Sequence, residues 1–215
     1  ENPGRAAGNG SVMRCIPVAL RYHDDLDRLI RVSTQQAAIT HADERCTWAA
    51  VAVNLAAREL LHGNIYFIDE VLHRLGDRAP RVLRDAIHRV PREREGELPI
   101  TRPGETGFVV HCVEIAFWFV THDWTLEESL IYLVHAGGDT DTNAAVAGAL
   151  LVMGMFMTAI VGMVRMLASG QSVPSVMVIH VIGTVLTILG ALSTLIAVFV
   201  LLLPVILSMA ACKVV

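Results

Sequence analysis

Charged residues are nearly absent from the last third of this 215-residue sequence. No Asp or Glu occurs after Asp141, and the basic residues after Asn143 are Arg165 and Lys213. The part up to Asn143 therefore carries a formal charge of about −6, and the remainder about +2. The whole chain is mildly acidic, with a formal net charge of −4, which argues against a nucleic-acid-binding surface.

Cysteine and leader signals are also scarce. The four cysteines, Cys15, Cys46, Cys112 and Cys212, are scattered and form no Cys-x-x-Cys motif. This pattern favours buried free thiols in a reducing compartment. No charged segment followed by an apolar run marks a signal peptide. The chain opens on Glu1 rather than Met, and we expect it to be a fragment of a longer protein.

Strand patterns are missing as well, because no segment alternates apolar and polar residues over a useful length. Apolar residues recur at helical spacing instead, which predicts an all-α head with short loops. Residues 91–107 hold three prolines and three glycines and are expected to form a loop. We predict a bend near Pro17. The expected helices cover residues 13–22, 24–40, 43–62, 65–75, 81–90, 109–121 and 124–135.

The most distinctive stretch is Gly137-Gly138-Asp139-Thr140-Asp141-Thr142. Two carboxylates and a hydroxyl within one turn are hard oxygen ligands, which suit Mg²⁺, Mn²⁺ or Ca²⁺ better than Zn²⁺. The glycine pair allows a sharp turn and a close approach to a ligand. The alternative interpretation is an ordinary capped helix start.

Two further motifs precede it. Gly8-Asn9-Gly10-Ser11-Val12-Met13-Arg14 begins with a loop whose backbone N–H groups can cradle a phosphate or a ribose. The simpler alternative is a surface turn with Ser11 as the N-cap of the next helix. Thr40-His41 ends a helical run, where a histidine can also be a partner of the helix dipole.

In their order and rough spacing these three motifs resemble the ADP-ribosylglycohydrolase family, over about residues 1–150. The resemblance implies an all-α helical bundle, here partial, and a hydrolase that removes ADP-ribose from modified protein side chains or related compounds. It implies two divalent ions, Mg²⁺ or Mn²⁺, with Asp139, Asp141 and Thr142 as ligands. It assigns substrate contacts to Gly8, Asn9, Gly10, Ser11, Met13 and His41, with His41 in a positioning role.

One element of the family pattern is missing from this sequence. An N-terminal Thr-Asp-Asp group, which supplies further metal ligands in the family, should precede Gly8. With half of the ligand set we expect weak metal binding, and no catalytic residue is assigned.

Two other groups of residues have competing interpretations. His111 and Glu114 share one helix face and could be a pair near the cleft, although a structural role is favoured. Asp24 and Asp25 precede a helix and are interpreted as charges that interact with its dipole rather than as metal ligands.

The tail, residues 151–215, is expected to form membrane helices. Residues 144–164 contain no charge and are long enough to span a bilayer. Residues 175–211 form a second uncharged run, which as one helix would be about 55 Å long. Within it Gly183, Thr187, Gly190 and Thr194 place small residues on one face, as in close helix–helix packing, and His180 lies one turn earlier. The alternative is a deeply buried soluble core.

Two functions therefore stay open. The first is a metal-dependent hydrolase whose partners are ADP-ribosylated protein or ADP-ribose, with a cytoplasmic head and a membrane-anchored tail. The second is a membrane-anchored protein that binds ADP-ribose or a nucleotide without hydrolysis, or that is only structural. No nucleic-acid partner is expected in either case.

Overall fold

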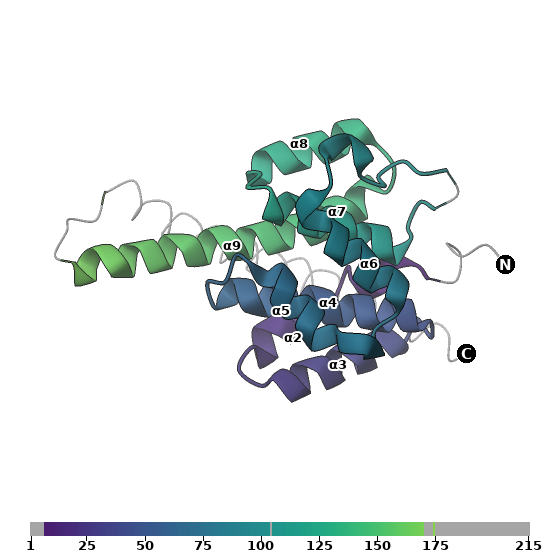
Figure 1. Ribbon diagram of the computed structural model, residues 1–215, viewed down its shortest axis with the longest axis horizontal. Helices are drawn as coiled ribbons and strands as arrows, with labels where there is room; N and C mark the ends of the chain where they lie inside the picture. Colours follow the sequence, from purple (N-terminus) through teal and green to yellow (C-terminus); the bar gives the residue numbers. More distant parts are fainter. Residues whose placement is uncertain (1–6, 104, 170–173, 175–215) are drawn as a thin grey trace, which may run out of the picture. The chain divides into compact units, whose positions relative to one another are not determined.

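A computed structural model describes residues 7–103, 105–169 and 174 of the chain. Contacts divide the chain into two units, Glu1–Met157 and Thr158–Val215. In the described residues the structure is all-α, as predicted, without a strand. The elements are η1 (Asn9–Ser11), α2 (Ile16–Tyr22), α3 (Leu26–Ala38), α4 (Glu44–Leu61), α5 (Phe67–Leu75), η2 (Gly76–Arg78), α6 (Arg81–Arg89), η3 (Val90–Arg92), η4 (Glu95–Glu97), α7 (Val109–Thr121), α8 (Leu126–Ala136) and α9 (Thr140–Ala168) (Figure 1).

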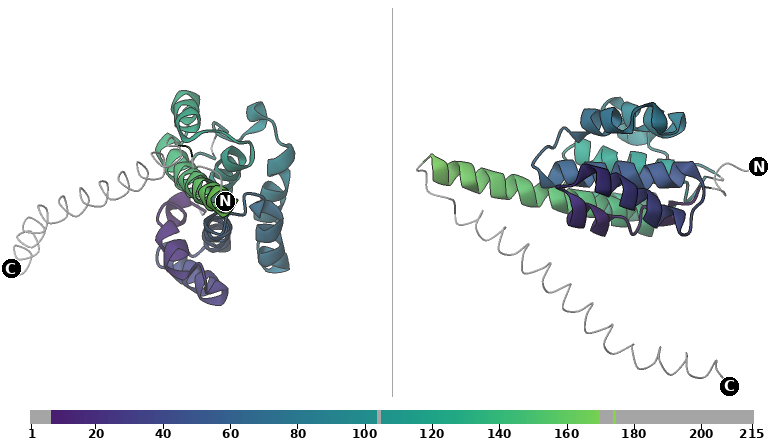
Figure 2. Two further views of the ribbon diagram at one scale, coloured as in Figure 1. Left: turned by 90° about the vertical axis from the view of Figure 1, so that its left-hand side faces the viewer. Right: turned by 90° about the horizontal axis from the view of Figure 1, so that it is seen from below.

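Helix α4 forms the centre of the first unit. It is rich in alanine and valine, and almost every residue from Ala49 to Leu60 is buried. Helices α2, α3, α5 and α7 all pack against it. In Figures 1 and 2, α2 and α3 lie together on one side of α4, with α5 and α6 on another. The small alanine side chains let the neighbouring helices approach closely, so the core forms around α4.

Helix α7 is the second core element. Its residues from Val109 to Phe119 are buried, and the ring of Phe117 meets that of Phe67 from α5 edge-on at 5.0 Å. The indole N–H of Trp118 donates to the backbone carbonyl of Glu93 at 2.8 Å. This bond ties the polar loop that follows α6 to the core helix.

The start of α2 differs from the sequence prediction. The helix begins at Ile16 rather than Met13 and its N-cap residue is Cys15, so the alternative interpretation of Ser11 as its N-cap is wrong. Pro17 lies in the first helical turn, where its missing N–H costs no hydrogen bond. In this position Pro17 gives no reason to expect a bend in α2.

The junction between α8 and α9 positions the acidic turn. Helix α8 begins with a capping box in which Thr125 and Glu128 bond reciprocally. It ends at Ala136 with Gly137 as its C-cap, and Gly137 and Gly138 both have positive φ angles, 78° and 73°. Two successive left-handed residues reverse the chain direction before α9.

Helix α9 begins as a core helix. Within the first unit its buried residues are Thr142, Asn143, Val146, Ala147, Leu150, Leu151 and Met153. In the described part of the chain, α9 alone is long and apolar enough to cross a membrane. The predicted membrane segment 144–164 thus begins with residues that complete the core of the head. The second apolar run, with His180, Gly183, Thr187, Gly190 and Thr194, lies outside the described residues.

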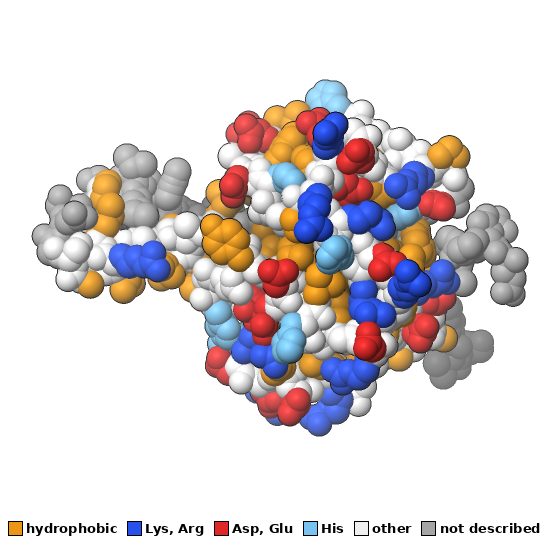
Figure 3. All heavy atoms as spheres, viewed as in Figure 1, with side chains coloured by type: hydrophobic (Ala, Val, Ile, Leu, Met, Phe, Trp, Pro, Cys, Tyr) orange, Lys and Arg blue, Asp and Glu red, His pale blue; other side chains and the backbone are white. Residues whose placement is uncertain are grey.

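Charges are mixed on the surface of the head. On the face shown in Figure 3, acidic and basic side chains are interspersed between histidines and apolar groups.

Candidate functional site

The glycine-rich loop is held by the segment that precedes α7. Gly8 forms an isolated antiparallel bridge with Phe108. The backbone N–H of Asn9 donates to the carbonyl oxygen of Gly107 at 3.0 Å. Gly107 has a φ of 82°, which a residue with a side chain rarely adopts. The pairing therefore joins residues 7–10 to the end of the 91–107 loop.

Helix α4 also holds the glycine-rich loop in place, through Cys46. The Ser11 hydroxyl is buried and donates to the carbonyl oxygen of Cys46 at 3.1 Å, and the Cys46 thiol donates to the carbonyl oxygen of Gly8 at 3.3 Å. Burial raises the pKa of Cys46 to about 11. The side chain of Ser11 is thus engaged within the fold, so the contact with substrate predicted for this residue would involve its backbone.

His41 packs against the two glycines of the loop. A Cβ added to Gly10 would lie 3.0 Å from Cε1 of His41, so a larger residue would fit only if the His41 ring shifted. Nδ1 of the ring lies 2.7 Å from Oγ1 of Thr40, which also accepts from Arg14 at 2.6 Å. Arg14 in addition donates to the carbonyl oxygen of Gly10 at 3.0 Å. The Thr-His motif and the loop thus form one connected unit.

The acidic turn joins the same unit. The amide of Asn9 donates to Oδ2 of Asp139, and the hydroxyl of Thr142 donates to Sδ of Met13 at 3.7 Å. Asp139 is half-buried and Thr142 is buried, whereas Asp141 is exposed in the first turn of α9. The structure therefore brings the three sequence motifs together, although Asp141 contributes no contact to the network.

The oxygen donors of the acidic turn fit a hard divalent cation in part. Two carboxylates and a hydroxyl are a donor set for Mg²⁺ or Mn²⁺, and Mg²⁺ commonly keeps several waters beside one or two carboxylates. The N-terminus of a helix by itself favours anions. The negative charges of Asp139 and Asp141 would have to outweigh that dipole for a cation to bind.

A pocket of about 410 Å³ lies beside the glycine-rich loop. Its lining includes Phe108, which forms the bridge with Gly8. His111 and Glu114 both line the pocket, but each has another partner: His111 lies 3.3 Å from Glu105, and Arg89 donates to Glu114 at 2.5 Å. Burial raises the pKa of Glu114 to about 7 and lowers the pKa of His111. The pocket is lined by Arg45, Val82, Arg89, Arg102, Glu105, Phe108, Val110, His111 and Glu114.

Sequence reasoning missed several residues that shape the site. Gly107 adopts a positive φ and pairs with the loop, and Cys46 bonds to it from below. Gln36 donates to the carbonyl oxygen of Ser11 at 3.3 Å. The one available signal was the glycine at the end of the 91–107 loop, directly before the apolar helix.

Comparison of the sequence with known proteins assigns the chain to a family. The ADP-ribosylglycohydrolase family model matches residues 1–160. An uncharacterized protein of Archaeoglobus fulgidus is 31% identical over 145 residues, which cover 66% of this chain and 47% of that protein. The ADP-ribosyl-[dinitrogen reductase] glycohydrolase of Rhodospirillum rubrum is 29% identical over 154 residues, 67% of this chain and 45% of the enzyme. The chain spans about half the length of these relatives. Since the family model covers most of its length, the chain belongs to the ADP-ribosylglycohydrolase family.

Proposed function

We propose that this chain supplies part of the active site of a metal-dependent hydrolase that releases ADP-ribose from modified protein side chains or related ADP-ribosyl compounds. The observation that supports this best is the contact between Asn9 and Asp139. It joins the glycine-rich loop to the acidic turn, although the two motifs are far apart in the chain. Membership of the ADP-ribosylglycohydrolase family supports the same reaction type.

The loop and His41 would hold the ADP-ribose moiety. The loop of Gly8, Asn9, Gly10 and Ser11 would lie against the ligand, with the thioether of Met13 at its edge. We infer that the Thr40 hydroxyl, which already accepts from Arg14, donates its proton to Nδ1 of His41. Nε2 then carries a proton beside the loop glycines and can donate to a ligand oxygen.

Asp139, Asp141 and Thr142 would hold Mg²⁺ or Mn²⁺. A divalent ion there would supply Lewis-acid polarisation and would orient a water and the ribose hydroxyls. Asn9 would fix the rotamer of Asp139 through its hydrogen bond, so that the carboxylate keeps its direction toward the cleft.

The apolar segments would attach the head to a membrane. Helix α9 has the length and composition of a membrane span, with its first half packed in the core of the head, and the sequence stays uncharged over residues 175–211. A head on the cytoplasmic side would reach ADP-ribosylated intracellular proteins as substrates.

The test is a calorimetric titration of the detergent-solubilised chain with Mn²⁺ and with ADP-ribose. Asp139→Ala/Asp141→Ala should abolish Mn²⁺ binding and weaken ADP-ribose binding. Asp27→Ala/Asp69→Ala is the matched control, because these exposed acids occupy the first turns of α3 and α5. Equal Mn²⁺ affinity in all three proteins would disprove the assigned ligands.

A second assay separates the hydrolase from the non-catalytic alternative. ADP-ribosylated protein is incubated with the chain and Mn²⁺, and released ADP-ribose is measured. Release that disappears in Asp139→Ala/Asp141→Ala supports the hydrolase. Binding of ADP-ribose without release shows that this chain alone binds the ligand but does not hydrolyse the bond.

A further inference from the structure

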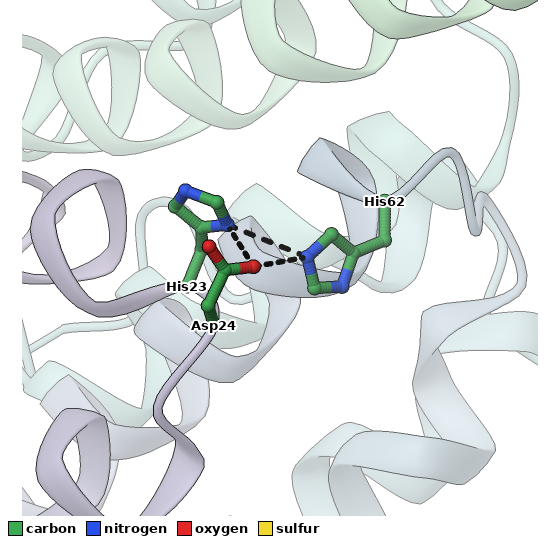
Figure 4. Close-up of side chains that lie close together, drawn as sticks. All are labelled: His23, Asp24 and His62. Carbon is green, nitrogen blue, oxygen red and sulfur yellow. Dashed lines mark hydrogen bonds and ion pairs between the residues drawn. The ribbon is translucent and has the colours of Figure 1, made fainter.

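We propose that His23, Asp24 and His62 form a binding site for a transition-metal ion of the zinc type. The three side chains come from two places in the sequence and converge on the surface of the head (Figure 4). His23 directly follows α2, Asp24 lies between α2 and α3, and His62 directly follows α4. Among the residues that the structure describes, this is the one group of at least three His, Cys, Asp or Glu side chains whose ligand atoms lie close enough to bind the same ion.

The distances match a tetrahedral ion. Oδ1 of Asp24 lies 2.9 Å from Nδ1 of His23 and 3.8 Å from Nε2 of His62, and the two nitrogens are 3.5 Å apart. Zinc bonds of 2.0–2.1 Å at tetrahedral angles place neighbouring ligand atoms about 3.3 Å apart. Each pair is therefore within about half an ångström of the separation that a shared Zn²⁺ requires.

Hydrogen bonds at the helix ends hold the main chain of both histidines in place. The N–H of His62 donates to the carbonyl oxygens of Arg58 and Glu59 at the end of α4. Nε of Arg58 donates to the carbonyl oxygen of His23 at 2.8 Å, which ties the end of α2 to the end of α4. Glu59 lies 2.5 Å from the guanidinium of Arg58 and offsets its positive charge. These bonds hold the backbone of both histidines, and their ring nitrogens already lie 3.5 Å apart without an ion.

Electrostatics also favour a cation at this place. Both histidines follow the C-termini of helices, where the helix dipoles are negative. The carboxylate of Asp24 adds a full negative charge, and its side chain is 83% exposed. Three ligands with open access leave a fourth position for water or for an exchangeable ligand.

The two aspartates before α3 have different roles, although the sequence suggested one role for both. Asp25 is the N-cap and accepts the N–H of Arg28 at 3.0 Å. Asp24 pairs with His23 and His62 instead. A surface pair of His and Asp adds little stability, so stability does not account for the convergence of all three side chains.

The ligand chemistry separates this site from the acidic turn. Imidazole nitrogens select zinc, copper, nickel or cobalt, whereas the oxygens of Asp139, Asp141 and Thr142 suit Mg²⁺ or Mn²⁺. The two sites can be tested independently, and the histidine site does not depend on the proposed hydrolase.

The experiment is a Co²⁺ titration of the full, metal-stripped chain in detergent, carried out on the Asp139→Ala/Asp141→Ala background. We expect one Co²⁺ per chain with the strong visible absorption of a four-coordinate ion, followed by displacement by Zn²⁺ at one equivalent. His23→Gln, His62→Gln and Asp24→Asn should each weaken Zn²⁺ binding about tenfold or more, because each removes one ligand.

The control is His73→Gln, which removes an exposed histidine from α5 without touching the cluster. It should leave both the spectrum and the Zn²⁺ affinity unchanged. His62→Asn serves as a second variant at the same position. Circular dichroism of each variant verifies that the helix content is unchanged. Equal affinity for wild type and His62→Gln, or equal losses in His62→Gln and His73→Gln, would overturn the proposal, as would the weak spectrum of six-coordinate Co²⁺.

Discussion

The side-chain amide of Asn9 donates a hydrogen bond to Oδ2 of Asp139, 130 positions further along the chain. Asn9 belongs to the short turn η1, and Asp139 directly precedes α9. Because Asn9 is only 8% exposed, water cannot easily replace this donor. The loop and the acidic turn therefore depend on each other for their geometry.

Replacing Asn9 should reveal this dependence in the stability of the head. Asn9→Ala removes the donor and should lower the free energy of unfolding by about 1–2 kcal/mol. Asn9→Asp should cost more at neutral pH, because it places a second carboxylate against Asp139. Chemical denaturation in detergent measures both, with the exposed Gln35→Ala as a control expected within about 0.5 kcal/mol of wild type. An Asn9→Asp variant as stable as wild type would contradict the hydrogen bond.

The two glycines of the acidic turn offer a matched pair of substitutions. A Cβ at Gly138 would overlap the carbonyl oxygen of Ile100, whereas a Cβ at Gly137 would meet nothing within 4 Å. Both residues have a positive φ, so Gly137→Ala should cost about 1 kcal/mol of backbone strain. Gly138→Ala adds a steric clash and should cost at least about 2 kcal/mol more. Equal melting temperatures for the two variants would show that the Ile100 contact is absent.

Glu114 should make the stability of the head depend on pH. Burial raises its pKa from the ordinary value of 4.5 to about 7, the neighbouring Glu93 adds to the rise, and Arg89 opposes it. A carboxyl group with a raised pKa stabilises the folded state fully below its unfolded pKa, and this contribution is lost as the pH rises through about 7.

The measurement compares wild type with Glu114→Gln between pH 4 and pH 8. Wild type should lose about 3 kcal/mol of unfolding free energy relative to the variant over this range. Parallel pH profiles for the two proteins would mean that the folded state does not keep Glu114 protonated between its ordinary pKa of 4.5 and about 7.

The apolar segments should control how the purified chain behaves in detergent. Helix α9 has the length and composition of a membrane span, and residues 175–211 contain no charge. In a Triton X-114 phase separation the full chain should therefore enter the detergent-rich phase. Recovery of a monodisperse protein from the aqueous phase would contradict the membrane interpretation.

The helices were predictable from local signals. Helix α7 has the predicted bounds, because its apolar run is limited by a glycine-containing loop before it and a polar turn after it. Helix α8 starts within two residues of its predicted beginning at residue 124, where Thr125 and Glu128 form a capping box. The start of α2 was less predictable, because Ser11 resembles an N-cap in sequence but bonds to Cys46 of α4 in the fold. Such a tertiary contact leaves no local signal.

The site was predictable in its members but not in its connections. The motifs around Asn9, His41 and Asp139 were found through the resemblance to a family, whose ligand and substrate roles remain predictions for this chain. The bridge between Gly8 and Phe108 joins segments about 100 residues apart and follows only from the packing of α7 on α4. The cluster of His23, Asp24 and His62 was missed because His62 is separated from the other two in the sequence and meets them only where the ends of α2 and α4 lie together.

The thiol of Cys46 gives the glycine-rich loop a built-in reporter of its motion. It donates to the carbonyl oxygen of Gly8 from inside the fold, and its pKa of about 11 keeps it unreactive while that bond is intact. An alkylating reagent can reach the sulfur only when the loop lifts away from α4. The labelling rate of Cys46 therefore measures how often the loop opens, and a ligand that rests on the loop should slow this rate.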